Sequence, residues 1–217
     1  MARLSLSFLG AFQVVLGQKI ITNFRSANVQ GLLVYLAMQA ERPFPRDVLA
    51  TLFWPEERES KARANLRQSL YQLRKVLRDD EGERPFLLID RHTVQFNQES
   101  EYELDVGQFM AALANGDLAA AASHYKGELL PGFTFTCDSL DFEAWLRSER
   151  EQLHRQVLES LFEWAEQLLA NGHYQQAQTA AKRQLELEPW REEGRKRAWC
   201  GGSVLVLAQS RAYRQLC

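Results

Sequence analysis

The chain has 217 residues, of which 46% are apolar and 25% are charged, and its formal net charge at pH 7 is −2. This composition provides enough apolar residues for one large domain or for two domains of about 100 residues each. No run of about 18 apolar residues predicts a membrane span, and no signal-peptide layout opens the chain, so we expect a cytoplasmic protein without a membrane partner. Cys137, Cys200 and Cys217 stand far apart, which favours reduced thiols over a zinc site or a disulfide framework.

Charge is unevenly divided along the chain. Residues 1–100 contain 14 Lys and Arg against 11 Asp and Glu, whereas residues 101–217 contain 12 against 17. Any contact with nucleic acid is therefore expected in the first half.

The first half begins with strands and continues with helices. Apolar and polar residues alternate between residues 3 and 24, with breaks at Gly10 and Gly17, which predicts three short strands in an antiparallel meander. Apolar residues then recur at helical spacing, which predicts one helix over 26–38 with Ser26 as its cap and a second, short helix within 45–55.

The stretch 60–78 predicts a third helix, amphipathic and basic, with six Lys or Arg and no acidic residue. Its predicted apolar stripe consists of Ala62, Leu66, Leu70, Leu73 and Leu77. At about 100° per residue, the opposite side carries Lys61, Asn65, Gln68, Tyr71, Gln72 and Lys75, with Arg63, Arg67, Arg74 and Arg78 along one flank. Amides can read base edges and cations can bind phosphates, although a charged outer face is common on soluble helices and Arg74 could instead pair with an acid of its own domain.

A hairpin is predicted next, because two apolar strands within 86–89 and 93–96 flank a turn that contains Arg91 and His92. Strands, three helices with a basic third and then a hairpin follow the order of a winged helix, whose third helix enters the major groove. A family resemblance rests on Leu9-Gly10-Ala11-Phe12, Arg46, Leu49, Leu52-Phe53-Trp54-Pro55, Ala62, Leu66, Leu70, Leu73, Arg74 and Leu77. In these residues the segment resembles the OmpR/PhoB-type winged-helix domain at the N-terminus of SARP-type bacterial transcriptional activators, the antibiotic-regulatory-protein family.

This resemblance implies that Gln68 and Gln72 face the bases, and the helical spacing independently places both on the outer side. Glutamine can pair with adenine through two hydrogen bonds, which provides roughly 1–3 kcal/mol of discrimination, and Asn65 is expected to assist. The predicted phosphate contacts are Lys61, Arg63, Arg67, Tyr71, Lys75 and Arg91.

The second half is predicted to be helical almost throughout. The polar stretch 97–104 suggests a boundary between a domain at 1–98 and a domain at 103–217. Leu113-Ala114-Asn115-Gly116 recurs as Leu169-Ala170-Asn171-Gly172, and residues 158–191 have the spacing of a tetratricopeptide repeat. Such helix pairs stack side by side into a solenoid.

A second resemblance rests on Asp105, Phe109, Tyr125-Lys126-Gly127-Glu128-Leu129-Leu130, Trp145, Arg150 and Leu187-Glu188-Pro189. In these residues the second half resembles the bacterial transcriptional activation domain that follows the winged helix in the same family. The resemblance implies self-association and contacts with other proteins; the alternative is a domain that only packs beside the first. After Glu193 the sequence departs from the pattern and Gly201-Gly202 would break a helix, which suggests an altered reading frame or a fragment of a longer regulator.

No enzymatic motif is present. The chain lacks a phosphate-binding Gly-x-x-x-x-Gly-Lys loop, a His-Glu-x-x-His zinc motif and a Gly-x-Ser-x-Gly nucleophile motif. Glu151 and His154 have the spacing of half a carboxylate-bridged metal site, but no second half exists, and a solvated helix face explains them better. We therefore predict no enzyme, no cofactor and no metal.

The predicted fold is mainly α with a small β component: a winged helix-turn-helix with an N-terminal antiparallel sheet, followed by an all-helical tetratricopeptide-like domain. The predicted function is a sequence-specific transcriptional regulator, expected to be an activator, that reads direct repeats in promoter DNA. RNA polymerase and a second copy of the chain on DNA are the expected partners. The alternative is an interaction adaptor whose winged helix no longer contacts DNA.

Overall fold

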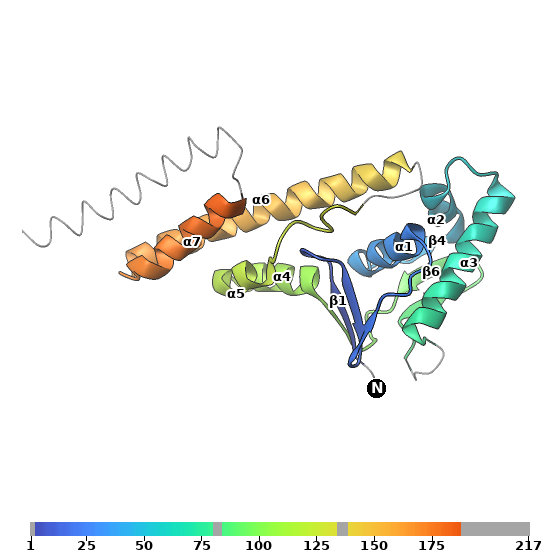
Figure 1. The fold of residues 1–217 in the computed structure, drawn as a ribbon, viewed down its shortest axis with the longest axis horizontal. Helices are drawn as coiled ribbons and strands as arrows, with labels where there is room; N and C mark the ends of the chain where they lie inside the picture. The colour runs from blue at the N-terminus through green and yellow to red at the C-terminus, as the bar shows by residue number, and fades with distance from the viewer. Residues whose placement is uncertain (1–2, 80–83, 134–138, 188–217) are drawn as a thin grey trace, which may run out of the picture. The chain divides into compact units, whose positions relative to one another are not determined.

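The computed structural model describes residues 3–79, 84–133 and 139–187, which form a mainly helical fold with two small sheets (Figure 1). In chain order, the first part contains β1 (Leu4–Ser7), β2 (Gln13–Leu16), β3 (Lys19–Ile21), α1 (Ala27–Met38), β4 (Phe44–Pro45), α2 (Arg46–Phe53), α3 (Glu59–Leu77), β5 (Leu87–Ile89), β6 (Thr93–Phe96) and β7 (Tyr102–Leu104). The elements that follow are α4 (Asp105–Ala114), α5 (Leu118–His124), α6 (Leu140–Ala170) and α7 (Tyr174–Leu187).

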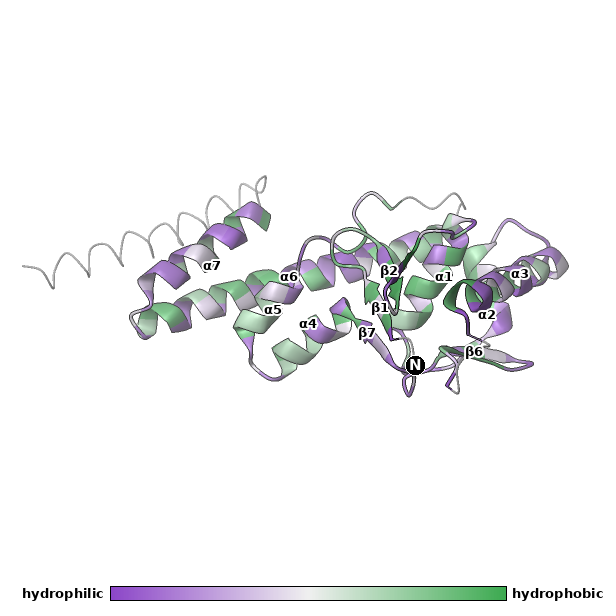
Figure 2. Ribbon diagram, turned by 60° about the horizontal axis from the view of Figure 1, so that its bottom comes forward, coloured by the Kyte–Doolittle hydropathy of each residue, from purple (hydrophilic) through white to green (hydrophobic). Residues whose placement is uncertain are grey.

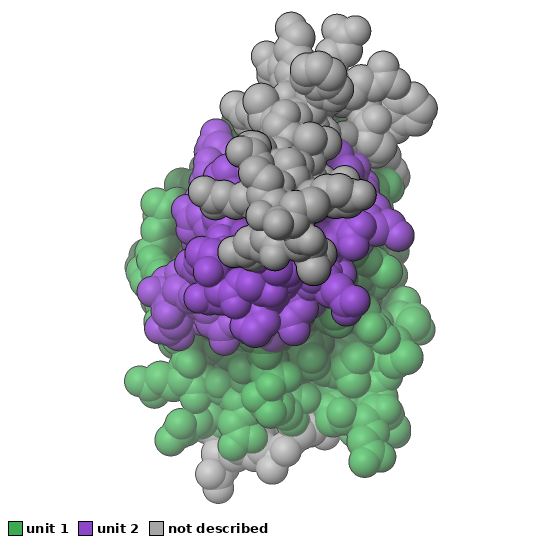
Figure 3. Space-filling model, turned by 90° about the vertical axis from the view of Figure 1, so that its left-hand side faces the viewer, with its two compact units in different colours: residues 1–108, 126–151 green, residues 109–125, 152–217 purple. Residues whose placement is uncertain are grey.

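The chain divides into two compact units, residues 1–108 with 126–151 and residues 109–125 with 152–217 (Figure 3). The first unit thus includes a segment from the second half of the sequence. The domain limits predicted from the sequence, 1–98 and 103–217, were drawn from its composition and not from contacts between residues. They remain a prediction.

The N-terminal sheet has the strand order β3-β2-β1-β7. The three predicted strands form the expected antiparallel meander, but β7 lies parallel to β1, with Leu4 opposite Tyr102. The sheet is therefore mixed, and the prediction of an antiparallel N-terminal sheet is wrong in this respect. The polar stretch 97–104 gave no strand signal, because β7 joins the sheet through its backbone and buries only Leu104.

A buried carboxylate, that of Asp105, accepts hydrogen bonds at the end of this sheet. The backbone N–H of Phe8 donates to both of its oxygens, at 3.0 and 2.8 Å, and the N–H groups of Leu9 and Val106 donate at 2.9 and 2.8 Å. Burial raises the pKa of this carboxyl above its ordinary value, whereas the three N–H donors act in the opposite direction. Asp105 thereby connects the end of β1 to the first turn of α4.

The central helix of the first unit is α1, which begins at the predicted cap, where the Ser26 hydroxyl accepts a hydrogen bond from the Val29 N–H. Residues 31–37 are buried without exception, so α1 is apolar on nearly all sides, while α3 is largely hydrophilic (Figure 2). Both α1 and α2 pack against α3. A second sheet, β4-β6-β5, contains the predicted hairpin and the short strand β4, which the sequence pattern did not indicate.

Segment 126–151 completes the first unit. The Gly10 N–H donates to the Glu128 carbonyl at 2.9 Å, and the Leu130 N–H donates to the Phe8 carbonyl at 2.8 Å. The Arg150 guanidinium donates to the carbonyl oxygens of Leu129 and Leu130 at 2.8 and 2.5 Å.

An aromatic cluster joins the first turns of α6 to α1 and α2. The ring centroids of Trp145 and Tyr35 lie 4.8 Å apart, and those of Phe142 and Phe53 lie 5.0 Å apart. Pairs in this distance range contribute about 0.5–1.5 kcal/mol beyond the burial of their surface.

The internal sequence repeat is also a structural repeat of the second unit. α4 and α6 end with the same turn, in which Gly116 and Gly172 have positive φ angles of 71° and 77°. The Asp117 N–H donates to the Ala112 carbonyl, and the His173 N–H donates to the Leu168 carbonyl, 56 residues further on. α5 and α7 begin two residues after these glycines. Each copy is a helix, a glycine-terminated turn and a second helix.

No helix within the described residues is long and apolar enough to cross a membrane. The predictions for the sequence after Glu193 and for the three cysteines concern residues outside the described part of the chain.

Candidate nucleic-acid interface

α3 buries the side that its sequence pattern predicts. Its buried residues are Ala62, Leu66, Ser69, Leu70, Leu73 and Leu77, which confirms the five predicted apolar positions and adds Ser69. The helix begins at Glu59, and Arg78 ends it in the left-handed conformation with φ 52°. This buried stripe fixes the orientation of α3 and thereby determines which of its other side chains face outward.

The three predicted base-reading residues lie away from the buried stripe. Gln68 is exposed, whereas Asn65 and Gln72 are half-buried. Within the described residues, no hydrogen bond engages the side-chain amides of Gln68 or Gln72. Each amide therefore offers a donor and an acceptor to an incoming group.

Two of the predicted phosphate-binding cations already have acidic partners in the first unit. Lys61 Nζ lies 2.6 Å from Glu57 Oε1, while Arg63 lies 2.7 Å from an Asp47 oxygen and 2.6 Å from a Glu59 oxygen. Exposed ion pairs of this kind contribute about 0–1 kcal/mol, so a phosphate could replace the carboxylates at small cost. The Asp47 partner was missed in the sequence because it lies 16 residues away, on α2.

The remaining predicted phosphate contacts on α3 are more available. Arg67 and Lys75 are exposed, and the described residues form no ion pair with either. The Tyr71 side chain is also presented to solvent, at 63% exposure. By contrast, Arg74 Nε lies 3.7 Å from an oxygen of the buried Asp79, which confirms the alternative that Arg74 pairs within its own domain.

The hairpin tip is held by Asp90. Its carboxylate accepts hydrogen bonds from the His92 and Thr93 N–H groups, both at 2.6 Å, and from the Thr93 hydroxyl at 2.7 Å. These bonds, above all those from Thr93, lower the pKa of the Asp90 carboxyl from 3.8 to about 2. Arg46, at the start of α2, donates through its side chain to the Asp90 carbonyl and through its N–H to the His92 carbonyl. The exposed Arg91 therefore sits on an ordered turn.

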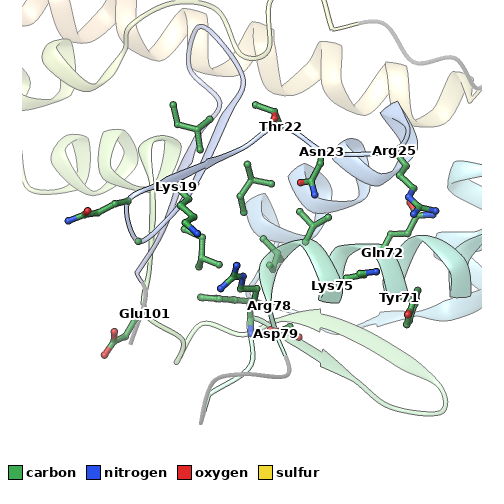
Figure 4. A pocket seen from close by; sticks show the side chains of 18 of the residues that line it. Lys19, Thr22, Asn23, Arg25, Tyr71, Gln72, Lys75, Arg78, Asp79 and Glu101 are labelled. Carbon is green, nitrogen blue, oxygen red and sulfur yellow. Dashed lines mark hydrogen bonds between the residues drawn. The ribbon is translucent and has the colours of Figure 1, made fainter.

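A hollow of about 890 Å³ lies along the C-terminal half of α3 (Figure 4). One wall contains Gln68, Tyr71, Gln72 and Lys75 of α3, and another contains β3 with Thr22, Asn23 and Arg25. These two segments could not be associated from the sequence, because nothing in their spacing indicates that β3 approaches α3. Within the described residues, no cluster of three or more His, Cys, Asp or Glu could hold a metal ion.

Comparison with known proteins identifies the family. Residues 91–200, just over half of the chain, match the family model described as Bacterial transcriptional activator domain, and the chain belongs to this family. The family is one of transcriptional activators and is not an enzyme family, and the recognition of this family from the sequence is confirmed. DNA and the transcription machinery are the partner classes that such a family implies.

Among solved structures, the chain is similar to EmbR of Mycobacterium tuberculosis, determined in complex with a low-affinity phosphopeptide. The TM-score is 0.57 at 21% sequence identity, with 88% of this chain and 52% of the EmbR chain covered. The chain thus shares the fold of EmbR and spans about half of its length. No curated protein sequence matches the chain.

Proposed function

We propose that this protein is a sequence-specific DNA-binding activator in which α3 is the recognition helix of a winged helix-turn-helix. α2 and α3 would form the helix-turn-helix, and the β5–β6 hairpin would be the wing. The observation that carries the proposal is the division of α3: one side is buried and mostly leucine, and the other presents amides and cations to solvent. The first unit also presents Arg91 on an ordered hairpin tip.

In this proposal Gln68 and Gln72 read base edges, with Asn65 in support. A side-chain amide can donate to and accept from adenine in the major groove, which is the geometry that discriminates adenine from other bases. Gln68 is better placed for this contact because its side chain is exposed, whereas that of Gln72 is half-buried.

Phosphate contacts would come from Arg67, Tyr71, Lys75 and the wing residue Arg91, and from Lys61 and Arg63 after exchange of their carboxylate partners. These contacts provide affinity and salt dependence without sequence information. Because Lys61 and Arg63 must first leave Glu57 and Asp47, we expect a smaller contribution from them than from Lys75.

The helical domain is proposed to be the tetratricopeptide-like part that contacts proteins. Its described surface includes three large apolar side chains, Phe162, Tyr174 and Leu185, each about half exposed. A contiguous apolar patch is typical of an interaction site, and these three side chains are the candidates for one. We propose that this domain places two copies on direct repeats of a promoter and helps to recruit RNA polymerase.

The test is to select bound DNA from a random pool with the whole chain and then to measure binding of variants against salt concentration. Gln68→Ala and Gln72→Ala should each cost about 1–3 kcal/mol on the selected site and relax its sequence preference. Lys75→Ala should weaken binding to all sequences and reduce the slope of log K against log salt by about 0.9. Absence of any selected sequence would contradict the proposal.

The alternative function is an interaction adaptor, which the exposed Phe162, Tyr174 and Leu185 also favour. It predicts weak DNA binding without sequence preference, unaffected by Gln68→Ala. The two functions are therefore distinguished by the same binding series.

A further inference from the structure

Cations line the hollow beside α3 on the side opposite the recognition residues. Lys19 belongs to β3, and Arg25 belongs to the segment that connects β3 to α1; both are exposed, and both line the hollow together with Gln72 and Lys75 (Figure 4). Within the described residues neither Lys19 nor Arg25 takes part in an ion pair. Their charge is thus available to a ligand in the hollow.

The hollow is basic as a whole. Five cationic side chains line it, Lys19, Arg25, Lys75, Arg78 and Arg84, against two acidic ones, Asp79 and Glu101. The Asp79 carboxylate is buried and accepts a hydrogen bond from the Phe86 N–H, so it faces the interior. Glu101 is exposed, so its carboxylate is the one that would repel an anion bound in the hollow.

A helix in the major groove lies between two phosphate backbones, because the groove is only about 12 Å wide. A protein segment that lies beside the recognition helix in the groove is therefore close to the phosphate backbone of one DNA strand. Along the C-terminal half of α3 this segment is β3 with its extension to Arg25. A volume of about 890 Å³ is too small for a duplex but can admit the sugar–phosphate edge of one strand.

We propose that Lys19 and Arg25 form a second phosphate-binding wall, which clamps one DNA backbone against Tyr71 and Lys75 of α3. This inference rests on the proposed function, since it requires α3 to be the recognition helix. Lys19 lies on the edge strand β3, where a cation also discourages pairing with other strands. The clamp supplies register and affinity and reads no bases.

The experiment measures binding of the whole chain to its selected DNA site over a range of salt concentrations. Lys19→Ala and Arg25→Ala should each lower the slope of log K against log salt by about 0.9, which corresponds to roughly eightfold weaker binding at 0.1 M salt. Base preference should stay unchanged. Phosphate-ethylation interference should disappear at the same few phosphates on one strand in both variants.

Matched controls are Lys182→Ala on α7 and Arg155→Ala on α6, which remove the same charges from exposed positions outside the hollow. Their salt slopes should equal that of the wild type. Glu101→Gln should have the opposite effect on DNA binding. Because it removes the carboxylate that opposes an anion, it should tighten binding and steepen the slope of log K against log salt. Thermal melting of each variant verifies that the fold is retained.

The outcomes separate the two hypotheses. If the wild type selects no DNA sequence, the proposed function fails and the clamp fails with it. The other outcome is that the wild type binds a specific sequence while Lys19→Ala and Arg25→Ala have the same salt slopes as the control variants. In that case α3 remains the proposed recognition helix, and only the clamp is contradicted.

Discussion

The exposed carboxylate of Asp90 determines how the hairpin presents Arg91. Three hydrogen bonds from His92 and Thr93 favour its ionised form and explain why its pKa is about 2 rather than 3.8. Since the folded-state pKa is lowered, the resulting stabilisation is present above pH 3.8 and is lost as the pH falls toward 2.

We therefore expect the carboxyl carbon of Asp90 to titrate by NMR with a midpoint near pH 2, together with the amide signals of His92 and Thr93. Asp90→Asn should abolish the titration of both amides. A midpoint at the ordinary value near 3.8 would show that the turn is not held by this carboxylate.

At the scale of elements, the two glycine turns show that the repeat of the second unit depends on backbone conformation. Gly116 and Gly172 occupy the left-handed region, and a Cβ added at either position would meet no atom within 4 Å. Any cost of substitution there is thus conformational strain, without a steric clash.

Gly116→Ala and Gly172→Ala should each lower the free energy of unfolding by about 1–2 kcal/mol, measured by urea unfolding. Gly107→Ala is the matched control: Gly107 lies inside α4, where its Cβ would make an ordinary 3.8 Å contact with Leu104, so this change should stabilise slightly, by up to about 1 kcal/mol. Equal effects at all three positions would contradict the role of the turns.

At the scale of the whole molecule, the first compact unit combines residues from both halves of the sequence. Asp105 binds the N–H groups of Phe8 and Leu9, while Arg150 holds the carbonyls of Leu129 and Leu130. A chain that ends at residue 98 lacks Asp105 and Arg150, and with them the carbonyl groups that Arg150 holds. It also lacks four buried side chains of the unit: Leu129, Leu130, Phe142 and Leu146.

Burial of such side chains contributes about 1.5–3 kcal/mol each, which together is comparable to the whole stability of a typical domain. We expect residues 1–98 alone to lack a cooperative urea transition and dispersed amide signals. A chain that ends at residue 151 retains every residue of the first unit and should unfold cooperatively. Equal behaviour of the two would support the compositional boundary near residue 98.

Local patterns were sufficient for most of the helices and strands and for the orientation of α3. The leucine stripe predicted its buried side, and Ser26 predicted where α1 begins, because these signals depend on neighbours a few residues away. β7 and β4 were missed, since a short strand that contributes mainly backbone hydrogen bonds has no side-chain period to detect.

The family, the helical character and the outward position of Gln68 and Gln72 could all be predicted from the sequence, because they follow from residue order and helical spacing. Which cations remain available for a ligand depends on the fold. Lys61, Arg63 and Arg74 have acidic partners, whereas Lys19 and Arg25 face the hollow beside α3. Coulombic attraction acts through space at a few ångströms, and it is the fold that brings Asp47 to Arg63 and β3 to α3.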